Sequence, residues 1–141
     1  MISIKITSSY SVKINNYTKV LRPTVNIYRK AVSFFIDVID TEWESFSSIT
    51  NTNGSVLIAE RLTHSTKNNL SVKYNFDERF YKFPSYLRRA AIADAFGIVS
   101  SYRTNLANWE TSDRKNKPPR LKKNHSRNPC FYYNNMFEGD C

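Results

Sequence analysis

Glycine and cysteine are scarce in this chain. Only three glycines and two cysteines occur among its 141 residues, together with two histidines. The sequence therefore has no glycine-rich phosphate-binding loop and no GxSxG or HExxH motif. Cys130 and Cys141 make neither a disulfide framework nor a zinc quartet, and His64 and His125 lie at no ligand spacing to them. We expect no metal or other cofactor in this chain.

Long apolar runs are also missing. The longest, residues 32–39, is interrupted by Ser33 and Asp37 and is far shorter than the roughly 20 residues that a membrane-spanning helix needs. Residues 1–14 alternate between apolar and polar side chains, with no continuous apolar stretch typical of a secretory signal. We therefore expect a cytoplasmic protein without membrane contact.

Acidic residues are absent from residues 114–127 (RKNKPPRLKKNHSR), which we call the basic segment. It carries seven lysines and arginines in a chain whose net charge is +9. Their mutual repulsion, together with Pro118 and Pro119, predicts an extended conformation and favours an anionic partner, most simply nucleic acid. The alternative is a solvated linker that binds nothing.

Two long helices are predicted from the apolar periodicity. Residues 3–7 and 11–14 alternate as half-buried strands do. An amphipathic helix then begins at Pro23 and ends near Ile49, a shorter one covers residues 56–63, and after a linker at residues 67–83 Pro84 opens the second long helix. Its apolar stripe consists of Leu87, Ala91, Ala95, Ile98, Tyr102, Leu106 and Trp109.

The reverse side of the second long helix carries small residues. This arrangement predicts close approach by a second element, either a packed protein element or a nucleic-acid backbone, and Gly97 costs about 1 kcal/mol relative to alanine in mid-helix. Arg89 and Arg103 flank the apolar stripe, and Arg88 lies in the first turn, where its side chain can extend outward. The small residues are Ala90, Ala93, Gly97, Ser101, Thr104 and Asn108.

No set of residues forms a recognisable catalytic constellation. Asp37, Asp40 and Glu44 lie on the polar arc of the first long helix, where we interpret them as surface charges. His64 has no nucleophile at a suggestive spacing. We therefore expect no catalysis by this chain alone.

Three stretches of the sequence resemble the amino-terminal part of TnpB-type (OrfB-type) transposon proteins, which are relatives of the type V CRISPR effectors. They are FPSYLRRAAIADAFGIVSSYRTNLANWE at residues 83–110, KPPRL at residues 117–121 and NPCFYYNNMF at residues 128–137. The resemblance covers about the last 60 residues. It implies an α+β fold in which both ends of the chain supply strands of an incomplete, wedge-like β-barrel and a helical insertion forms a recognition lobe.

The resemblance also implies a domain organisation. Residues 1–20 would supply the first barrel strands, residues 21–112 the helical insertion, and residues 113–141 the basic connector with the start of a second barrel segment. The magnesium-dependent, RuvC-like nuclease domain of that family has no counterpart in this sequence, so we expect a truncated chain that lacks its activity. Unpaired barrel edges would then favour self-association.

The function expected from the resemblance is binding of guide RNA and target DNA, as the non-catalytic portion of a transposon-encoded, RNA-guided nuclease. The competing hypothesis is a protein interaction module with an incidental basic linker, and neither hypothesis calls for a small-molecule substrate. The candidate nucleic-acid contacts are Arg88, Arg89, Arg103, Lys117, Arg120, Lys122, Lys123 and Arg127.

Overall fold

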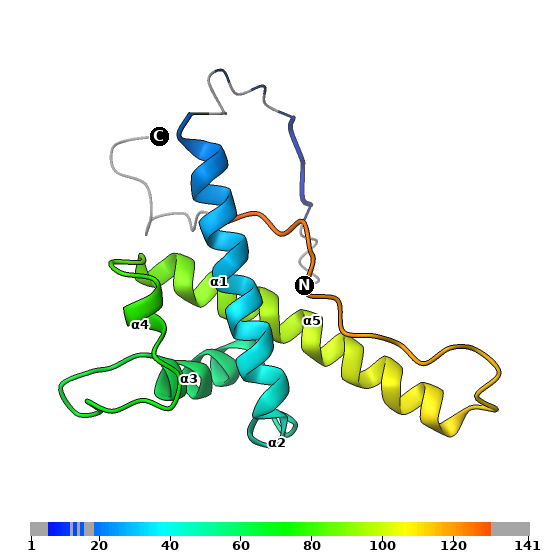
Figure 1. The fold of residues 1–141 in the computed structure, drawn as a ribbon. Helices are drawn as coiled ribbons and strands as arrows, with labels where there is room; N and C mark the ends of the chain where they lie inside the picture. The colour runs from blue at the N-terminus through cyan, green and yellow to red at the C-terminus, as the bar shows by residue number, and fades with distance from the viewer. Residues whose placement is uncertain (1–5, 12, 14, 16–18, 131–141) are drawn as a thin grey trace, which may run out of the picture.

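In the computed structural model, all regular structure of the described residues is helical (Figure 1). The structure describes residues 6–11, 13, 15 and 19–130. Two long helices cross at the centre, and their mutual contact is the most extensive between any two helices of the described residues. The helices in chain order are α1 (Leu21–Thr41), α2 (Trp43–Phe46), α3 (Thr52–Thr63), α4 (Phe76–Arg79) and α5 (Ser85–Thr111).

The amphipathic pattern of the first long helix forms α1, but α1 is shorter than predicted. Glu42 leaves the helical conformation, with φ −100° and ψ 26°, and the chain resumes as the single turn α2. The predicted end near Ile49 is therefore wrong by about two turns, because this break redirects the aromatic residues that follow it. Phe46 then packs in the core instead of extending the stripe of α1.

Aromatic rings fill the space between α1, α4 and α5. Phe35 of α1 stacks on Phe76, with ring centroids 4.8 Å apart, and Phe76 stacks in turn on Phe80 at 4.7 Å. The side chain of Asn75 caps α4 by accepting a hydrogen bond from the Glu78 amide at 3.1 Å. The predicted linker at residues 67–83 thus contains a capped helical turn that supplies core aromatics.

The second long helix begins where it was predicted, immediately after Pro84. Ala91 and Ala95 of its predicted apolar stripe are fully buried, and their small side chains allow α5 to cross α1 closely. Toward the C-terminal end of α5 the packing thins, and Trp109 is only half-buried. One end of α5 therefore belongs to the core, while the other supports the chain that follows.

The predicted α+β fold with barrel strands is wrong for the part of the chain that the structure describes. Its sole β-type pairing is an isolated bridge between Thr66 and Asn69. Ile6 and Tyr10, in the alternating N-terminal stretch, are 87% and 88% exposed; alternation predicts a strand only where a partner strand covers the apolar side. Residues 3–5, 12 and 14 of the predicted strands and residues 131–137 of the closing segment lie outside the described residues.

Without strands in the described chain, there are no barrel edges there to support the predicted self-association. No helix among the described residues is both long enough and apolar enough to cross a bilayer.

Candidate nucleic-acid interface

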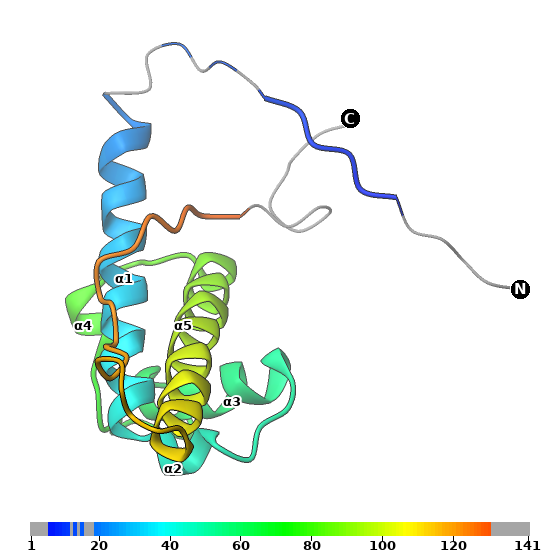
Figure 2. The same ribbon diagram turned by 90° about the vertical axis from the view of Figure 1, so that its right-hand side faces the viewer.

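The basic segment turns back at the end of α5 and runs along α1 (Figure 2). Trp109 fixes the reversal, because its indole Nε1 donates a hydrogen bond to the Asn116 carbonyl at 2.7 Å. Arg114 adopts a left-handed backbone conformation with φ 57°, and its guanidinium lies over the Trp109 ring, 5.4 Å from the ring centroid. The half-buried end of α5 thus sets the direction of the segment.

Hydrogen bonds from α1 hold the far end of the segment. Arg29 donates from Nε to the Arg127 carbonyl at 3.0 Å and from Nη2 to the side-chain oxygen of Asn128 at 2.9 Å. Leu121 packs against the hydrophobic core at the middle of the segment. The segment forms no helix or strand. It is docked on the helices at these points, and most of its side chains remain exposed.

Carboxylates of the helices neutralise part of the charge of the basic segment, in addition to Asp113, which lies 3.1 Å from Lys115. Asp37 of α1 pairs with Lys123 at 2.5 Å, and Asp94 of α5 lies 3.8 Å from Arg127. Asp94 also accepts a hydrogen bond of 2.6 Å from the hydroxyl of the buried Tyr28, which fixes its position. Asp37 is therefore not only a surface charge, because it also anchors the segment.

His125 joins the segment to α1 through both ring nitrogens. Nδ1 accepts from the Arg127 amide at 3.3 Å, and Nε2 lies 3.4 Å from Ser33 Oγ, which in turn donates to the Lys123 carbonyl at 3.4 Å. Burial lowers the pKa of His125 below its usual value, and the nearby Arg29 charge acts in the same direction. A neutral ring protonated on Nε2 satisfies this network, since Nδ1 must remain an acceptor.

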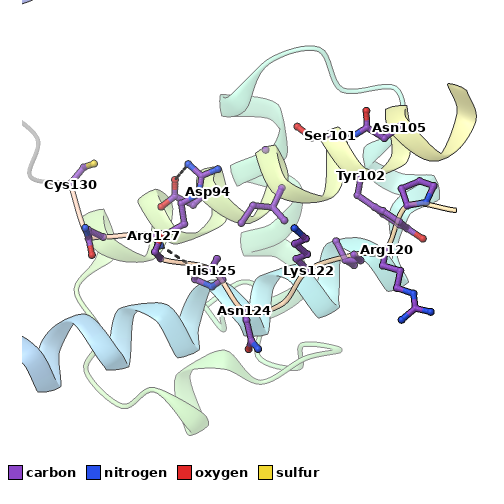
Figure 3. Close-up of a pocket in the computed structure, with 16 residues that line it drawn as sticks. Asp94, Ser101, Tyr102, Asn105, Arg120, Lys122, Asn124, His125, Arg127 and Cys130 are labelled. Carbon is purple, nitrogen blue, oxygen red and sulfur yellow. Dashed lines mark hydrogen bonds and ion pairs between the residues drawn. The ribbon is translucent and has the colours of Figure 1, made fainter. Parts of the chain in front are cut away.

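A groove of about 920 Å³ lies between α5 and the basic segment (Figure 3). We call it the α5 groove. A Cβ added at Gly97 would meet no atom within 4 Å, so no described element covers the helix there. The close protein packing considered for the small-residue side is therefore wrong at Gly97. The side of α5 that faces the groove carries Asp94, Gly97, Ile98, Ser101, Tyr102 and Asn105.

Three cations of the segment have neither an ion pair nor a side-chain hydrogen bond among the described residues. They are the exposed Lys117, Arg120 and Lys122, and the last two line the α5 groove. Arg114 also has no ion pair there, but its guanidinium donates to the Glu110 carbonyl at 3.4 Å. Lys122 and Lys123 take opposite sides, since Lys122 lines the groove while Lys123 pairs with Asp37 on α1. This is the alternation expected of extended backbone. Of the eight predicted contacts, these three are the most accessible to an anion.

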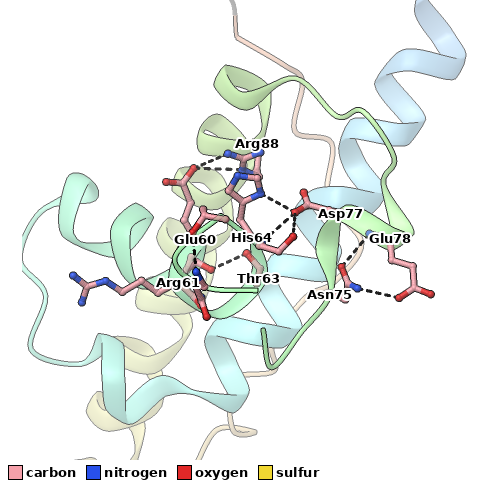
Figure 4. A network of polar contacts seen from close by, with 12 residues as sticks. Glu60, Arg61, Thr63, His64, Asn75, Asp77, Glu78 and Arg88 are labelled. Atoms are coloured by element: carbon pink, nitrogen blue, oxygen red, sulfur yellow. Dashed lines mark hydrogen bonds and ion pairs between the residues drawn. The ribbon is translucent and has the colours of Figure 1, made fainter. Parts of the chain in front are cut away.

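Arg88 is paired with a carboxylate inside the fold (Figure 4), and the exposed Arg89 lies near the same carboxylate. The Arg88 guanidinium is buried and donates to Glu60 Oε1 on α3 at 3.0 and 3.3 Å. Arg89 Nε reaches the same oxygen at 3.4 Å. The prediction that Arg88 extends outward is wrong, because Glu60 offers a charged partner at the α3–α5 contact. Figure 4 also shows His64, which lies 2.7 Å from Asp77.

Arg103 is likewise committed to an intramolecular partner. Its Nη2 donates to the Asp40 carboxylate at 2.5 Å and to the Asp40 carbonyl at 3.1 Å, so it joins α5 to the C-terminal turn of α1. A cation is favourable there, because the last carbonyls of a helix carry partial negative charge. Its guanidinium also lies over the rings of Trp43 and Tyr102.

Two features of the site were missed by sequence reasoning. Arg29 and Ser33 lie one turn apart on the polar arc of α1 and bind the segment. Lys30 and Arg79, from α1 and α4, line a second pocket on the other side of the segment. The i to i+4 spacing of Arg29 and Ser33 is visible in the sequence, but their partners lie more than 89 residues away.

The family model of the Aq_aa04 family matches residues 7–140. The chain belongs to the Aq_aa04 family. No curated protein and no solved structure matches it. The resemblance to TnpB-type proteins remains a prediction, and the match to the Aq_aa04 family covers both the helices and the basic segment.

Proposed function

We propose that this member of the Aq_aa04 family binds single-stranded nucleic acid along the α5 groove, through the phosphate backbone. One observation carries the proposal. The helices hold the basic segment extended through Asp37, Asp94 and Arg29, while Lys117, Arg120 and Lys122 have no ion pair among the described residues. A segment held in this way loses little further conformational entropy when it binds.

The chemistry of the groove suits a backbone more than a base sequence. Lysine and arginine bind phosphate without reading bases, and Ser101 and Asn105 add small polar side chains on the facing helix. The uncovered backbone at Gly97 leaves room for a strand. We therefore expect little sequence preference. If the TnpB-type resemblance reflects descent, guide RNA or its DNA target is the natural ligand, and base pairing supplies the specificity.

We also propose that the protein acts in the cytoplasm. Cys130 is free and exposed, which suits a reducing compartment, where thiols are kept from forming disulfides.

Salt dependence tests the proposed binding directly. Fluorescence anisotropy with a 5′-hydroxyl single-stranded RNA of mixed sequence, and with the matching DNA, is measured from low to physiological salt. If the three cations neutralise three phosphates, a plot of the logarithm of the binding constant against the logarithm of the salt concentration should have a slope of about −2, at about 0.7 per phosphate. Two unrelated sequences should bind within about threefold of each other, because contacts to phosphate carry no sequence information. A slope near zero would contradict the proposal and favour the protein interaction module.

A further inference from the structure

A second, smaller pocket lies on the other side of the basic segment from the α5 groove. We call it the α1 pocket. It has a volume of about 280 Å³ and is formed by α1, the last residue of α4 and residues 123–125. Helical residues supply Lys30, Phe34 and Arg79, and the segment supplies Lys123. Three elements that are distant in the sequence thus converge on one cavity.

The charge of the α1 pocket is strongly positive. Four cationic side chains, Arg29, Lys30, Arg79 and Lys123, line it together with a single carboxylate, that of Asp37. With His125 neutral, the balance is four positive charges against one negative, or +3. Clustered cations along a concave wall concentrate the field and attract a small anion.

The partners of these cations determine which of them can receive a ligand. Lys123 is paired with Asp37, and Arg29 donates to the carbonyls of the basic segment. Lys30 has no ion pair among the described residues. The Arg79 guanidinium lies 5.8 Å from the centroids of both Phe34 and Phe80, and no carboxylate of the described chain pairs with it. These cation–π contacts position Arg79 and leave its charge without a carboxylate partner among the described residues.

We propose that the α1 pocket binds a phosphate group, held by Lys30 and Arg79. The planar guanidinium of arginine matches two oxygens of a phosphate, and the lysine ammonium supplies a compact charge beside it. The site goes beyond the proposed strand binding, because it is a discrete pocket for one anion on the opposite side of the segment. Its ligand is either free phosphate or the terminal phosphate of a nucleic-acid strand.

Occupancy of the α1 pocket also affects the basic segment. Lys123, Asn124 and His125 form one wall of the pocket, so an anion bound there attracts the segment toward α1. Phosphate should therefore slow amide exchange at residues 123–125. This readout distinguishes the pocket from diffuse attraction to the rest of the cationic surface.

The first experiment titrates the intact protein with inorganic phosphate at constant ionic strength, using calorimetry and amide hydrogen exchange. We expect saturable binding of one phosphate with protection of residues 123–125. The double variant Lys30→Gln/Arg79→Gln should weaken binding at least about tenfold, as expected for lost charge-assisted hydrogen bonds. The control Lys67→Gln/Arg61→Gln removes the same charges from exposed positions outside the pocket and should bind phosphate as the unmodified chain does. Non-saturable binding, or equal affinity of the two double variants, would overturn the proposal.

A second experiment distinguishes the two sources of phosphate. RNAs of one sequence, with a 5′-phosphate or a 5′-hydroxyl, are compared for binding to the unmodified chain and to Lys30→Gln/Arg79→Gln. Tighter binding of the phosphorylated strand, lost in the variant, assigns the pocket to a strand end. Equal binding of the two strands, together with saturable inorganic phosphate, assigns it to free phosphate. The phosphate titration contains no nucleic acid, so its result stands even if the proposed strand binding fails.

Discussion

The arginines of α5 and the cations of the basic segment differ in what surrounds them. Arg88 and Arg103 pack between helices, and each is paired with a carboxylate there. Lys117, Arg120 and Lys122 lie on extended backbone with no ion pair among the described residues. In the sequence both groups are cations that lie near small or apolar residues, so the sequence alone does not distinguish them. The difference is that a core helix brings the carboxylates of other helices within reach of its arginines. The carboxylates of the helices reach Lys123 and Arg127 of the segment, but they do not reach these three cations.

This comparison separates charge that stabilises the fold from charge that is available to a ligand. Loss of an ion pair on α5 should lower the free energy of unfolding. Loss of a cation of the segment should weaken nucleic-acid binding. The following predictions test that separation.

The largest effect is expected from Arg88→Leu. The substitution leaves the Glu60 carboxylate, 19% exposed, without its main partner, and breaking a buried ion pair in this way costs about 3 kcal/mol. Urea unfolding measures the change in the free energy of unfolding. The double variant Arg88→Leu/Glu60→Leu should recover part of the loss, because it removes the unpaired carboxylate as well. A loss below about 0.5 kcal/mol for Arg88→Leu, as at ordinary surface positions, would show that Arg88 is not a structural residue.

A smaller effect of opposite sign is expected from Gly97→Ala. The added Cβ meets no atom, and alanine is favoured over glycine in a helix interior by about 1 kcal/mol. Thermal unfolding should therefore show a higher melting temperature. The same variant should bind single-stranded RNA slightly more weakly if a strand lies against this part of α5. A lower melting temperature would mean that Gly97 is contacted in a way that the helices described here do not show.

The smallest effect concerns pH. The folded pKa of His125 lies below its usual value of 6.5, so protonation favours the undocked segment. The contribution of His125 to docking is complete above about pH 6.5 and is lost as the pH falls through the folded pKa. A protonated ring loses its acceptor for the Arg127 amide and adds charge beside Arg29. The neighbouring carboxylate of Asp94 offsets part of this effect.

Amide exchange of residues 121–127, corrected for intrinsic rates, measures this effect between pH 7.5 and pH 5. We expect faster exchange at the lower pH in the unmodified chain and a weaker dependence in His125→Gln. The variant leaves His64 in place, so it also controls for titration elsewhere. An identical pH dependence in both proteins would rule out His125 as the cause.

Local patterns predicted the helices but not their partners. Pro84 marked the start of α5, and the periodicity of residues 23–39 marked α1, because both signals depend on neighbours within a few residues. The predicted barrel was wrong because strand pairing depends on residues that are far apart in the sequence. No strand of the described chain pairs with the alternating residues near Ile6 and Tyr10, and alternation indicates a strand only where a partner strand covers the apolar side.

In the candidate site, too, local features were predicted from the sequence and contacts between distant residues were not. The sequence alone identified the basic segment and the absence of a helix in it, since charge repulsion and Pro118–Pro119 act locally. It did not show that Asp37 and Asp94 hold the segment, or that Glu60 occupies Arg88, because these contacts join residues between 28 and 86 positions apart. The accessible cations therefore follow only from the three-dimensional arrangement.

The salt dependence of RNA binding by two charge-matched triple variants tests the central claim most directly. Lys117→Ser/Arg120→Ser/Lys122→Ser removes the cations of the segment that have neither an ion pair nor a side-chain hydrogen bond among the described residues, and Lys19→Ser/Arg61→Ser/Lys67→Ser removes the same charge from exposed positions elsewhere. We predict that the log–log slope for single-stranded RNA falls by about 2 in the first variant and stays close to that of the unmodified chain in the second, with both variants folded. Equal slopes for the two variants would contradict the account, because binding would then follow net charge and not the docked basic segment.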